Sequence, residues 1–393
     1  MKEVAPAVIK AKALSAVWTF PSILLSAFII AWGAEAAQFL VSQGLALAIL
    51  AWLQTMPEFA VEAVIAWEAG KDIDKIHLVS ANFTGSIRLL VGLGWPMIYF
   101  VRSIARIRSG EGNALAPLEL DEEHSVEVLA LVPPVMYFFV ILAKGSLGLI
   151  DSVVLISLYV IYLIALLRIP PVEMEKPEEL PAVPRWVMKQ PERSRKWYVL
   201  ALFAGGGILL YFTAHPFLES MLALAISVGI SQYVFVQWVA PFLSEFPEKV
   251  SAFNWARTGK KAPIAMMNMV SSNINQWTLL IGMCPVIFSI SQGAFSAIEF
   301  DTHQRFEIAL TMVQSILGFM FLADMRLRWY EAAGLFVLWF IQFIIPHLRE
   351  EILVVYILWI LVVAVQFLIH RKEFHAVRCF HAIVKDWKKP KAG

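Results

Sequence analysis

Two Pro-Glu pairs inside long apolar stretches are the residues of this sequence best placed for chemistry. The first lies in "AWLQTMPEFAVEAVIAWEAG" (51–70), where Glu58 follows Pro57 and Glu62 comes one helical turn later. The second lies in "FLSEFPEKV" and contains Glu248. A proline inside a helix frees a backbone carbonyl, and the carboxylate beside it supplies a second hard oxygen. Because such oxygens suit Ca²⁺, Na⁺ or protons better than soft metals, the pairs predict a cation site.

The composition places these glutamates in a membrane. Of the 393 residues 59% are hydrophobic and 16% are charged, and the mean hydropathy is +0.68. Apolar windows long enough to cross a bilayer recur along the whole chain. Intramembrane carboxylates are costly and usually face an internal pathway. We therefore expect an integral protein of the cell (inner) membrane, with the lipid bilayer and inorganic cations as its partners and no nucleic acid.

No enzymatic motif accompanies the glutamates. The sequence has no H-E-x-x-H, no nucleophile elbow and no phosphate-binding loop, so it is not expected to be an enzyme. Its two cysteines have no metal-ligand spacing and look incidental.

The apolar windows and the breaks between them predict an all-α polytopic protein with five plus five helices and one additional C-terminal helix. The predicted spans lie near 15–43, 44–69, 76–101, 125–143, 147–167, 197–227, 230–256, 262–292, 306–325, 329–346 and 351–370. The predicted domains are a first half (13–168), a Pro-rich and charged linker (169–196), a second half (197–346), the additional helix (350–371) and a basic tail (372–393).

The two halves resemble each other in sequence. "TMPEFAVEAVIAWEAGKDIDKIHLVSANFTG" is echoed by "EFPEKVSAFNWARTGKKAPIAMMNMVSSNINQ": a Pro-Glu pair, a short charged loop with Gly, and a helix bearing V-S-x-N. An odd number of helices per repeat turns the second copy upside down. Inverted repeats are typical of secondary transporters, whose site lies at the midplane where the repeats meet.

These segments resemble the alpha repeats of the cation/calcium antiporter superfamily, which includes the sodium/calcium and proton/calcium exchangers. The family pattern runs roughly G-T-S-L-P-E, a short charged loop, then G-N-x-x-G-S-N-I-F-N. The resemblance implies a secondary antiporter with no cofactor beyond its transported ions. It places the metal-binding glutamates on Glu58 and Glu248, and the serine three residues earlier on Thr55 and Glu245, with Ser244 beside them.

This sequence departs from the family pattern in the first repeat, in the helix that follows the Pro-Glu pair. The family's Ser and Asn positions fall on Ser271 and Asn275 in the second repeat but on Ala81 and Gly85 in the first. Asn82, next to Ala81, supplies a ligand only if the register shifts by one residue.

Arg88 is a second departure, one turn beyond Gly85. A guanidinium is permanently charged and binds carboxylates bidentately. We expect Arg88 to pair with Glu58 or Glu62, in place of one bound cation. Arg88 and Glu62 would then tune the site without binding the ion.

Lys and Arg indicate the orientation. They concentrate in the linker, in the tail and in the loop containing Arg102, Arg106 and Arg108. By the positive-inside rule these segments are cytoplasmic and the N-terminus is outside.

Together these features predict a secondary active antiporter for Ca²⁺ or a related cation against H⁺ or Na⁺. Glu245 close to Glu248 favours H⁺, because adjacent like charges favour a proton on one of them. The alternative is a non-transporting membrane receptor or scaffold derived from an exchanger, which Arg88 and the two missing ligands support.

Overall fold

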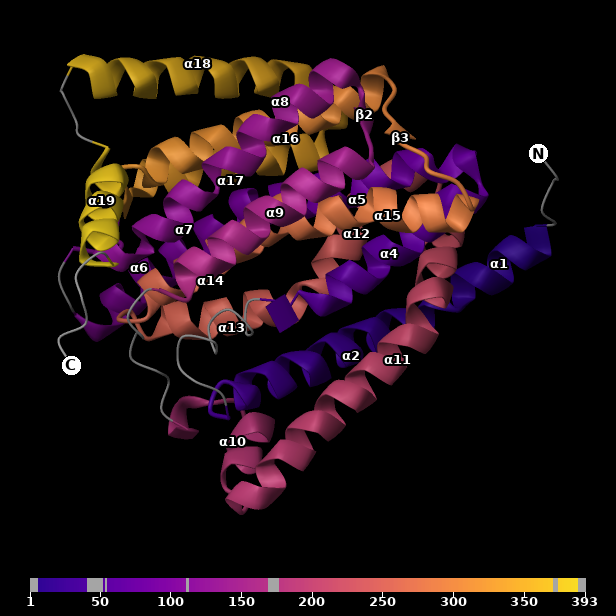
Figure 1. Cartoon of the computed structure of the whole chain (residues 1–393), viewed down its shortest axis with the longest axis horizontal. Helices are drawn as coiled ribbons and strands as arrows, with labels where there is room; N and C mark the ends of the chain where they lie inside the picture. Colours follow the sequence, from indigo (N-terminus) through magenta and orange to yellow (C-terminus); the bar gives the residue numbers. More distant parts are fainter. Residues whose placement is uncertain are drawn as a thin grey trace. The chain divides into compact units, whose positions relative to one another are not determined.

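The structure is a computed structural model that describes residues 6–40, 52–53, 55–110, 113–168, 177–369 and 374–387. Within these ranges the chain is almost entirely helical (Figure 1). Its α-helices are α1 (Pro6–Leu14), α2 (Ala16–Ala37), α4 (Met56–Lys71), α5 (Ile76–Leu89), α6 (Trp95–Ser109), α7 (Ser125–Ala130), α8 (Val132–Lys144), α9 (Leu149–Leu166), α10 (Ala182–Met188), α11 (Glu192–Ser227), α12 (Gln232–Ser244), α13 (Phe246–Arg257), α14 (Ala262–Asn275), α15 (Ile281–Gln292), α16 (Thr302–Leu322), α17 (Trp329–Ile344), α18 (Arg349–Ile369) and α19 (His375–Trp387).

Shorter elements connect these helices. The 3₁₀ turns are η1 (Ile73–Lys75), η3 (Glu122–His124), η4 (Pro177–Glu179) and η6 (Pro346–Leu348), and the π-helical turns are η2 (Leu90–Gly94) and η5 (Gln276–Leu280). The strands have two residues each: β1 (Leu118–Glu119), β2 (Ser146–Leu147), β3 (Ile298–Glu299) and β4 (Arg326–Leu327).

Eight helical stretches in the described part of the chain are long and apolar enough to cross a bilayer. They are Pro6–Ala37, Ile73–Ser109, Glu122–Lys144, Leu149–Leu166, Glu192–Ser227, Ala262–Gln292, Thr302–Leu322 and Pro346–Ile369. This confirms the all-α polytopic class.

The other three predicted windows form shorter helices. In window 44–69 the described helix is α4, of 16 residues, and residues 44–51 and 54 lie outside the described part. Window 230–256 is divided into α12 and α13 at Glu245. Window 329–346 is the 16-residue α17.

Two compact units divide the chain, and neither is a sequence half. Unit 1 contains 1–85, 170–248 and 283–298, and unit 2 contains 86–169, 249–282 and 299–393. Each unit therefore draws on both repeats. Of the predicted linker, residues 169–176 are outside the described part, while α10 and the start of α11 occupy much of the rest.

In unit 1, α2 and α11 lie along each other (Figure 1), and α4 and α12 pack against both. A glycine permits the close approach of the long pair: a Cβ on Gly206 would come within 2.7 Å of the Ile30 side chain. The α1–α11 contact carries the Lys12–Glu219 ion pair at 2.8 Å.

In unit 2, α16 packs against α8 and α18, and α6 and α17 pack together beside η2. β1 pairs antiparallel with β4, with Leu118 opposite Leu327. β2 pairs with β3. Phe300, the residue that follows β3, donates its N–H to the Gly145 carbonyl. Helix α19, in the predicted basic tail, packs against α7 and η3.

The elements follow a similar order in the two repeats. A helix that begins at a Pro-Glu pair leads into a second helix, a π-helical turn and a third helix: α4, α5, η2 and α6 in the first repeat and α13, α14, η5 and α15 in the second. Each third helix is followed by a two-residue strand, and each last helix, α9 or α17, is preceded by one.

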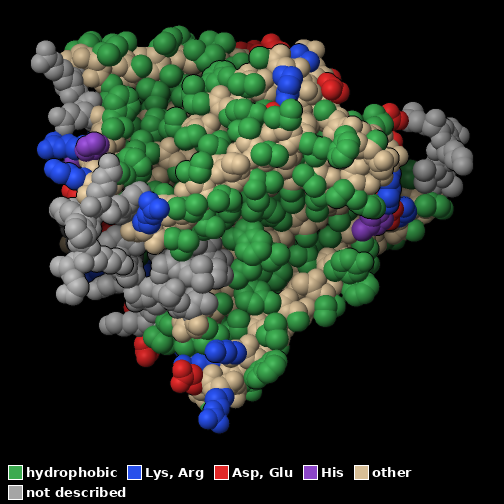
Figure 2. Space-filling model, viewed as in Figure 1, with side chains coloured by type: hydrophobic (Ala, Val, Ile, Leu, Met, Phe, Trp, Pro, Cys, Tyr) green, Lys and Arg blue, Asp and Glu red, His purple; other side chains and the backbone are tan. Residues whose placement is uncertain are grey.

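The outer surfaces of the long helices are apolar. Hydrophobic side chains predominate along the visible parts of α11 and α18 in Figure 2, apart from charged side chains at the lower end, where α11 begins. On α18 the exposed residues include Val354, Leu358 and Leu361. Such surfaces suit contact with lipid chains.

Candidate functional site

Both Pro-Glu pairs lie at the beginning of a helix. Pro57 is the second residue of α4 and Pro247 the second of α13. Proline is tolerated in the first helical turn, where its missing N–H has no partner to lose. The residues just before these helices, Thr55 (φ −86°, ψ −3°) and Glu245 (φ −95°, ψ 2°), have nearly the same backbone conformation. The two repeats therefore begin these helices in the same way.

The glutamates fall in the first turns of these helices. Glu58 is in the first turn of α4 and Glu248 in the first turn of α13. The positive end of a helix dipole stabilises negative charge there. Both side chains are buried, at 1% and 2% exposure. Each repeat thus holds a buried carboxylate at a helix N-terminus.

Most of the predicted site residues belong to unit 1. Besides Glu58 and Glu248, the unit contains Thr55, Ser244, Glu245, Glu62 and Asn82, all of them buried. The hydroxyl of Thr55 donates to the Trp52 carbonyl at 2.9 Å and that of Ser244 to the Ala240 carbonyl at 2.9 Å. Each hydroxyl still has lone pairs with which to accept a bond or bind a cation.

Glu62 is held by two neighbours in unit 1. Asn82 on α5 donates its amide N–H to Oε2 at 2.5 Å, and the Cys284 thiol on α15 donates to Oε1 at 3.3 Å. Asn82 therefore orients a carboxylate of the preceding helix. Cys284 looked incidental in the sequence, but in the structure it belongs to the buried group formed with Glu62 and Asn82.

Packing accounts for the missing ligand at Gly85. A Cβ there would lie 1.7 Å from the backbone oxygen of Gln237, so α12 occupies the space of a side chain. Gln237 is fully buried, and its amide donates to the Thr84 hydroxyl at 3.1 Å. A polar side chain from the second repeat thus lies beside the gap in the first.

Ser271 and Asn275 belong to unit 2, where both are buried. Ser271 accepts a hydrogen bond from the Tyr162 hydroxyl at 2.9 Å. Near Asn275, the amide of Gln276 donates to the Ser86 hydroxyl at 3.0 Å. The helix carrying these predicted ligands is therefore tied to the end of α5 by polar contacts.

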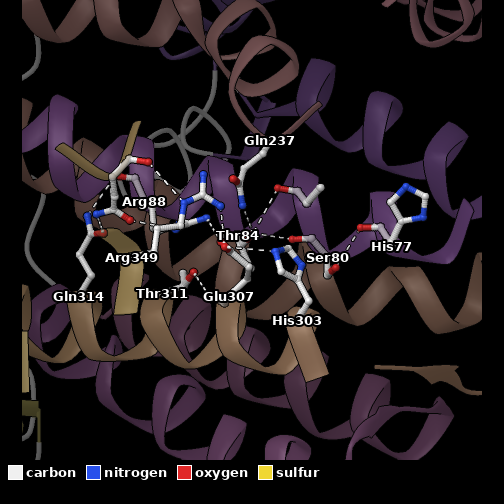
Figure 3. A network of polar contacts seen from close by, with 12 residues as sticks. His77, Ser80, Thr84, Arg88, Gln237, His303, Glu307, Thr311, Gln314 and Arg349 are labelled. Atoms are coloured by element: carbon white, nitrogen blue, oxygen red, sulfur yellow. Dashed lines mark hydrogen bonds and ion pairs between the residues drawn. The ribbon is translucent and has the colours of Figure 1, made fainter. Parts of the chain in front are cut away.

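Arg88 has a partner that was not predicted. Its guanidinium donates to Glu307 at 2.5 Å and to Gln342 at 2.9 Å, within unit 2 (Figure 3). The oxygens of Glu62 accept from Asn82 and Cys284 instead. The carboxylate that pairs with Arg88 is therefore Glu307 and not the expected Glu62, and the expected pairing with Glu58 stays a prediction.

Glu307 also accepts from Arg349 at 2.6 Å, and the His303 imidazole lies 3.9 Å away (Figure 3). The carboxylate and both guanidinium groups are at most 5% exposed. Sequence reasoning missed this cluster, although an acidic residue in the apolar run of α16 was a signal. Gln237, inside the apolar α12, was a similar signal.

The sequence profile described as sodium/calcium exchanger protein matches residues 10–168 and 198–346. Comparison with curated protein sequences gives no match.

Several solved structures are similar to this chain. The crystal structure of the H⁺/Ca²⁺ exchanger CAX superposes with a TM-score of 0.86 at 31% identity, covering 95% of this chain and 91% of that one. The sodium-calcium exchanger NCX_Mj gives a TM-score of 0.55 at 17% identity over 85% of this chain and 98% of its own. YfkE gives 0.58 at 16% identity over 86% and 96%.

Proposed function

Because the chain belongs to the sodium/calcium exchanger family and is therefore a cation antiporter, we propose that it exchanges Ca²⁺ for H⁺. The observation that carries the proposal is the pair of buried carboxylates, Glu58 and Glu248, each in the first turn of a helix that begins at a proline. Both belong to unit 1.

In this proposal Glu58 and Glu248 bind the ion. Ca²⁺ takes several oxygen ligands, so hydroxyl and backbone oxygens complete the shell. Thr55 lies just before α4, and Ser244 and Glu245 lie at the junction of α12 and α13. Ser271, Asn275 and Asn82 remain candidates, with Asn82 acting through Glu62.

Protons are the proposed counter-ion for a reason of charge. One Ca²⁺ neutralises two carboxylates, and two protons on Glu58 and Glu248 do the same. Glu245, also buried, adds a third acidic group at the junction of α12 and α13. A similar chain, CAX, is described as an H⁺/Ca²⁺ exchanger, which supports the choice of H⁺ over Na⁺.

The receptor or scaffold alternative loses its main support. Arg88 is paired with Glu307, which supplies a carboxylate for its charge. The missing ligand at Gly85 is explained by the packing of α12. Arg88 and Gly85 therefore no longer argue against ion binding, while Ala81 still lacks a ligand side chain.

The test is Ca²⁺ flux into proteoliposomes under an imposed pH or Na⁺ gradient. Wild type is compared with Glu58→Gln and Glu248→Gln, and with Glu219→Gln as a control that removes a half-exposed glutamate in the Lys12 ion pair. We expect flux to follow the pH gradient, to be lost in both site variants and to persist in the control.

Flux that follows only the Na⁺ gradient would replace H⁺ by Na⁺. Full flux in either site variant would remove that glutamate from the site. If folded wild type showed no flux with either gradient, the receptor reading would return.

A further inference from the structure

Helix α19 is docked on unit 2 by contacts of its first turns. The Ala376 N–H donates to the Ala323 carbonyl at 3.0 Å, and Ala376 is fully buried. Just before the helix, the Phe374 ring stacks on Phe367 with centroids 4.6 Å apart. These contacts turn one face of α19 toward α7 and η3.

That face carries a histidine and a cysteine one helical turn apart. His375 and Cys379 are separated by four positions, which places both side chains on the same side of a helix. His375 is exposed, whereas Cys379 is 4% exposed at the contact with the rest of unit 2. Glu122 of η3 approaches from the other side, and the ligand atoms of the three residues all lie within 4.8 Å of one another.

We propose that Glu122, His375 and Cys379 form a binding site for a soft divalent metal ion such as Zn²⁺, which fastens the tail helix to η3. Thiolate, imidazole and carboxylate are each zinc ligands, and a site with three protein ligands leaves the fourth position to water. Such a site is distinct in chemistry from a Ca²⁺ site, because calcium prefers oxygen ligands alone.

The geometry needs only a small adjustment. Metal–ligand bonds of about 2.0–2.3 Å at tetrahedral angles put the ligand atoms about 3.5 Å apart. Drawing atoms together from within 4.8 Å is a movement of about 1 Å. The exposed side chains of Glu122 and His375 are free to make it by changing rotamer.

Zn²⁺ binds the thiolate form of cysteine, so metal binding at Cys379 is expected to release the thiol proton. The neighbouring residues Asp121, Glu123 and His124 form a second group without a thiol, which offers a harder ligand set.

Cobalt titration of the full-length protein in detergent tests the proposal, because Co²⁺ occupies zinc sites and a thiolate ligand gives it a strong charge-transfer absorption. We expect this absorption in wild type, its displacement by Zn²⁺, and its persistence in a large excess of Ca²⁺. Cys379→Ser should abolish it, and His375→Asn and Glu122→Gln should weaken Co²⁺ binding about tenfold or more.

Two control variants define the result. His381→Asn removes an exposed histidine of the same helix outside the cluster, and Cys284→Ser removes the other thiol; both should keep the absorption. The proposal is overturned if Cys379→Ser retains the signal, if Cys284→Ser loses it, or if Ca²⁺ displaces the metal.

Thermal unfolding gives a second readout. Zn²⁺ should raise the Tm of wild type and leave that of Cys379→Ser unchanged, since only a native site linked to folding stabilises. Equal Tm values for both proteins in chelator would show that the variant is folded. An equal rise in both would also overturn the proposal.

Discussion

At the scale of single residues, Gly85 links packing to the family pattern. A ligand side chain is expected at this position, yet the backbone of Gln237 leaves no room for even a methyl group. Gln237 is buried there and bonds to Thr84. In this chain Gly85 therefore allows α5 and α12 to approach each other closely.

Replacing Gly85 by alanine should destabilise the protein strongly. Its Cβ would lie 1.7 Å from the Gln237 oxygen, and backbone cannot move aside as a flexible side chain does. Overpacking of this kind costs about 1–3 kcal/mol or more. The measurement is the apparent Tm of purified protein in detergent, together with its yield.

Gly207→Ala is the matched control, because nothing lies within 4 Å of its Cβ on α11. Alanine is the better helix former, so this variant should be as stable as wild type or slightly more so. A Gly85→Ala protein with an unchanged Tm would mean that α12 does not cross α5 so closely.

At the scale of elements, the buried cluster around Glu307 joins α5, α16 and the start of α18. One carboxylate pairs with the guanidinium groups of both Arg88 and Arg349. Gln342 on α17 accepts from Arg88 and donates to the Tyr356 hydroxyl at 3.1 Å. Four helices of unit 2 therefore depend on one acidic side chain.

Glu307→Gln should destabilise the protein more than Arg88→Gln or Arg349→Gln. The first change leaves two buried cations without their carboxylate, whereas either arginine change leaves one balanced ion pair. Removing one partner of a buried pair costs about 3–5 kcal/mol. Apparent Tm values of the three variants, measured in parallel in detergent, test the ranking. Equal losses in all three would show that Glu307 is not the shared partner.

The elements also show how far sequence reasoning reaches. Apolar length predicted the long helices, because a membrane span needs a continuous run of apolar residues. It failed at window 230–256, where Pro247 ends one helix and starts another within a single apolar run. Residues 44–69 and 329–346 also read as full spans, but the described helices there are 16 residues long.

For the candidate site, too, the sequence predicted some features and missed others. Proline beside glutamate in an apolar run made Glu58 and Glu248 the candidate ligands, because both residue types are unusual there. The partner of Arg88 was not predictable, since Glu307 is far along the sequence and is brought near only by packing. The same holds for Cys284, whose contact with Glu62 depends on α15 passing α4.

At the scale of the whole molecule, the two compact units matter because each is built from both repeats. Unit 1 holds both Pro-Glu pairs together with the long helices α2 and α11. The two sequence repeats therefore do not correspond to the two compact units. Any movement of one unit against the other would involve both repeats at once.

The distribution of basic residues predicts the orientation of the whole chain in the bilayer. The basic residues of the linker and tail predict that both are cytoplasmic, and the odd number of predicted spans then predicts an N-terminus on the outside. A fluorescent reporter that folds only in the cytoplasm should be active when fused after Gly393. Alkaline phosphatase, active only outside, should be inactive at the same position. Moving both fusions to His347, before α18, removes one span and should reverse both readings. Phosphatase activity at Gly393 would invert the orientation, and identical readings at the two positions would mean that α18 does not cross the membrane.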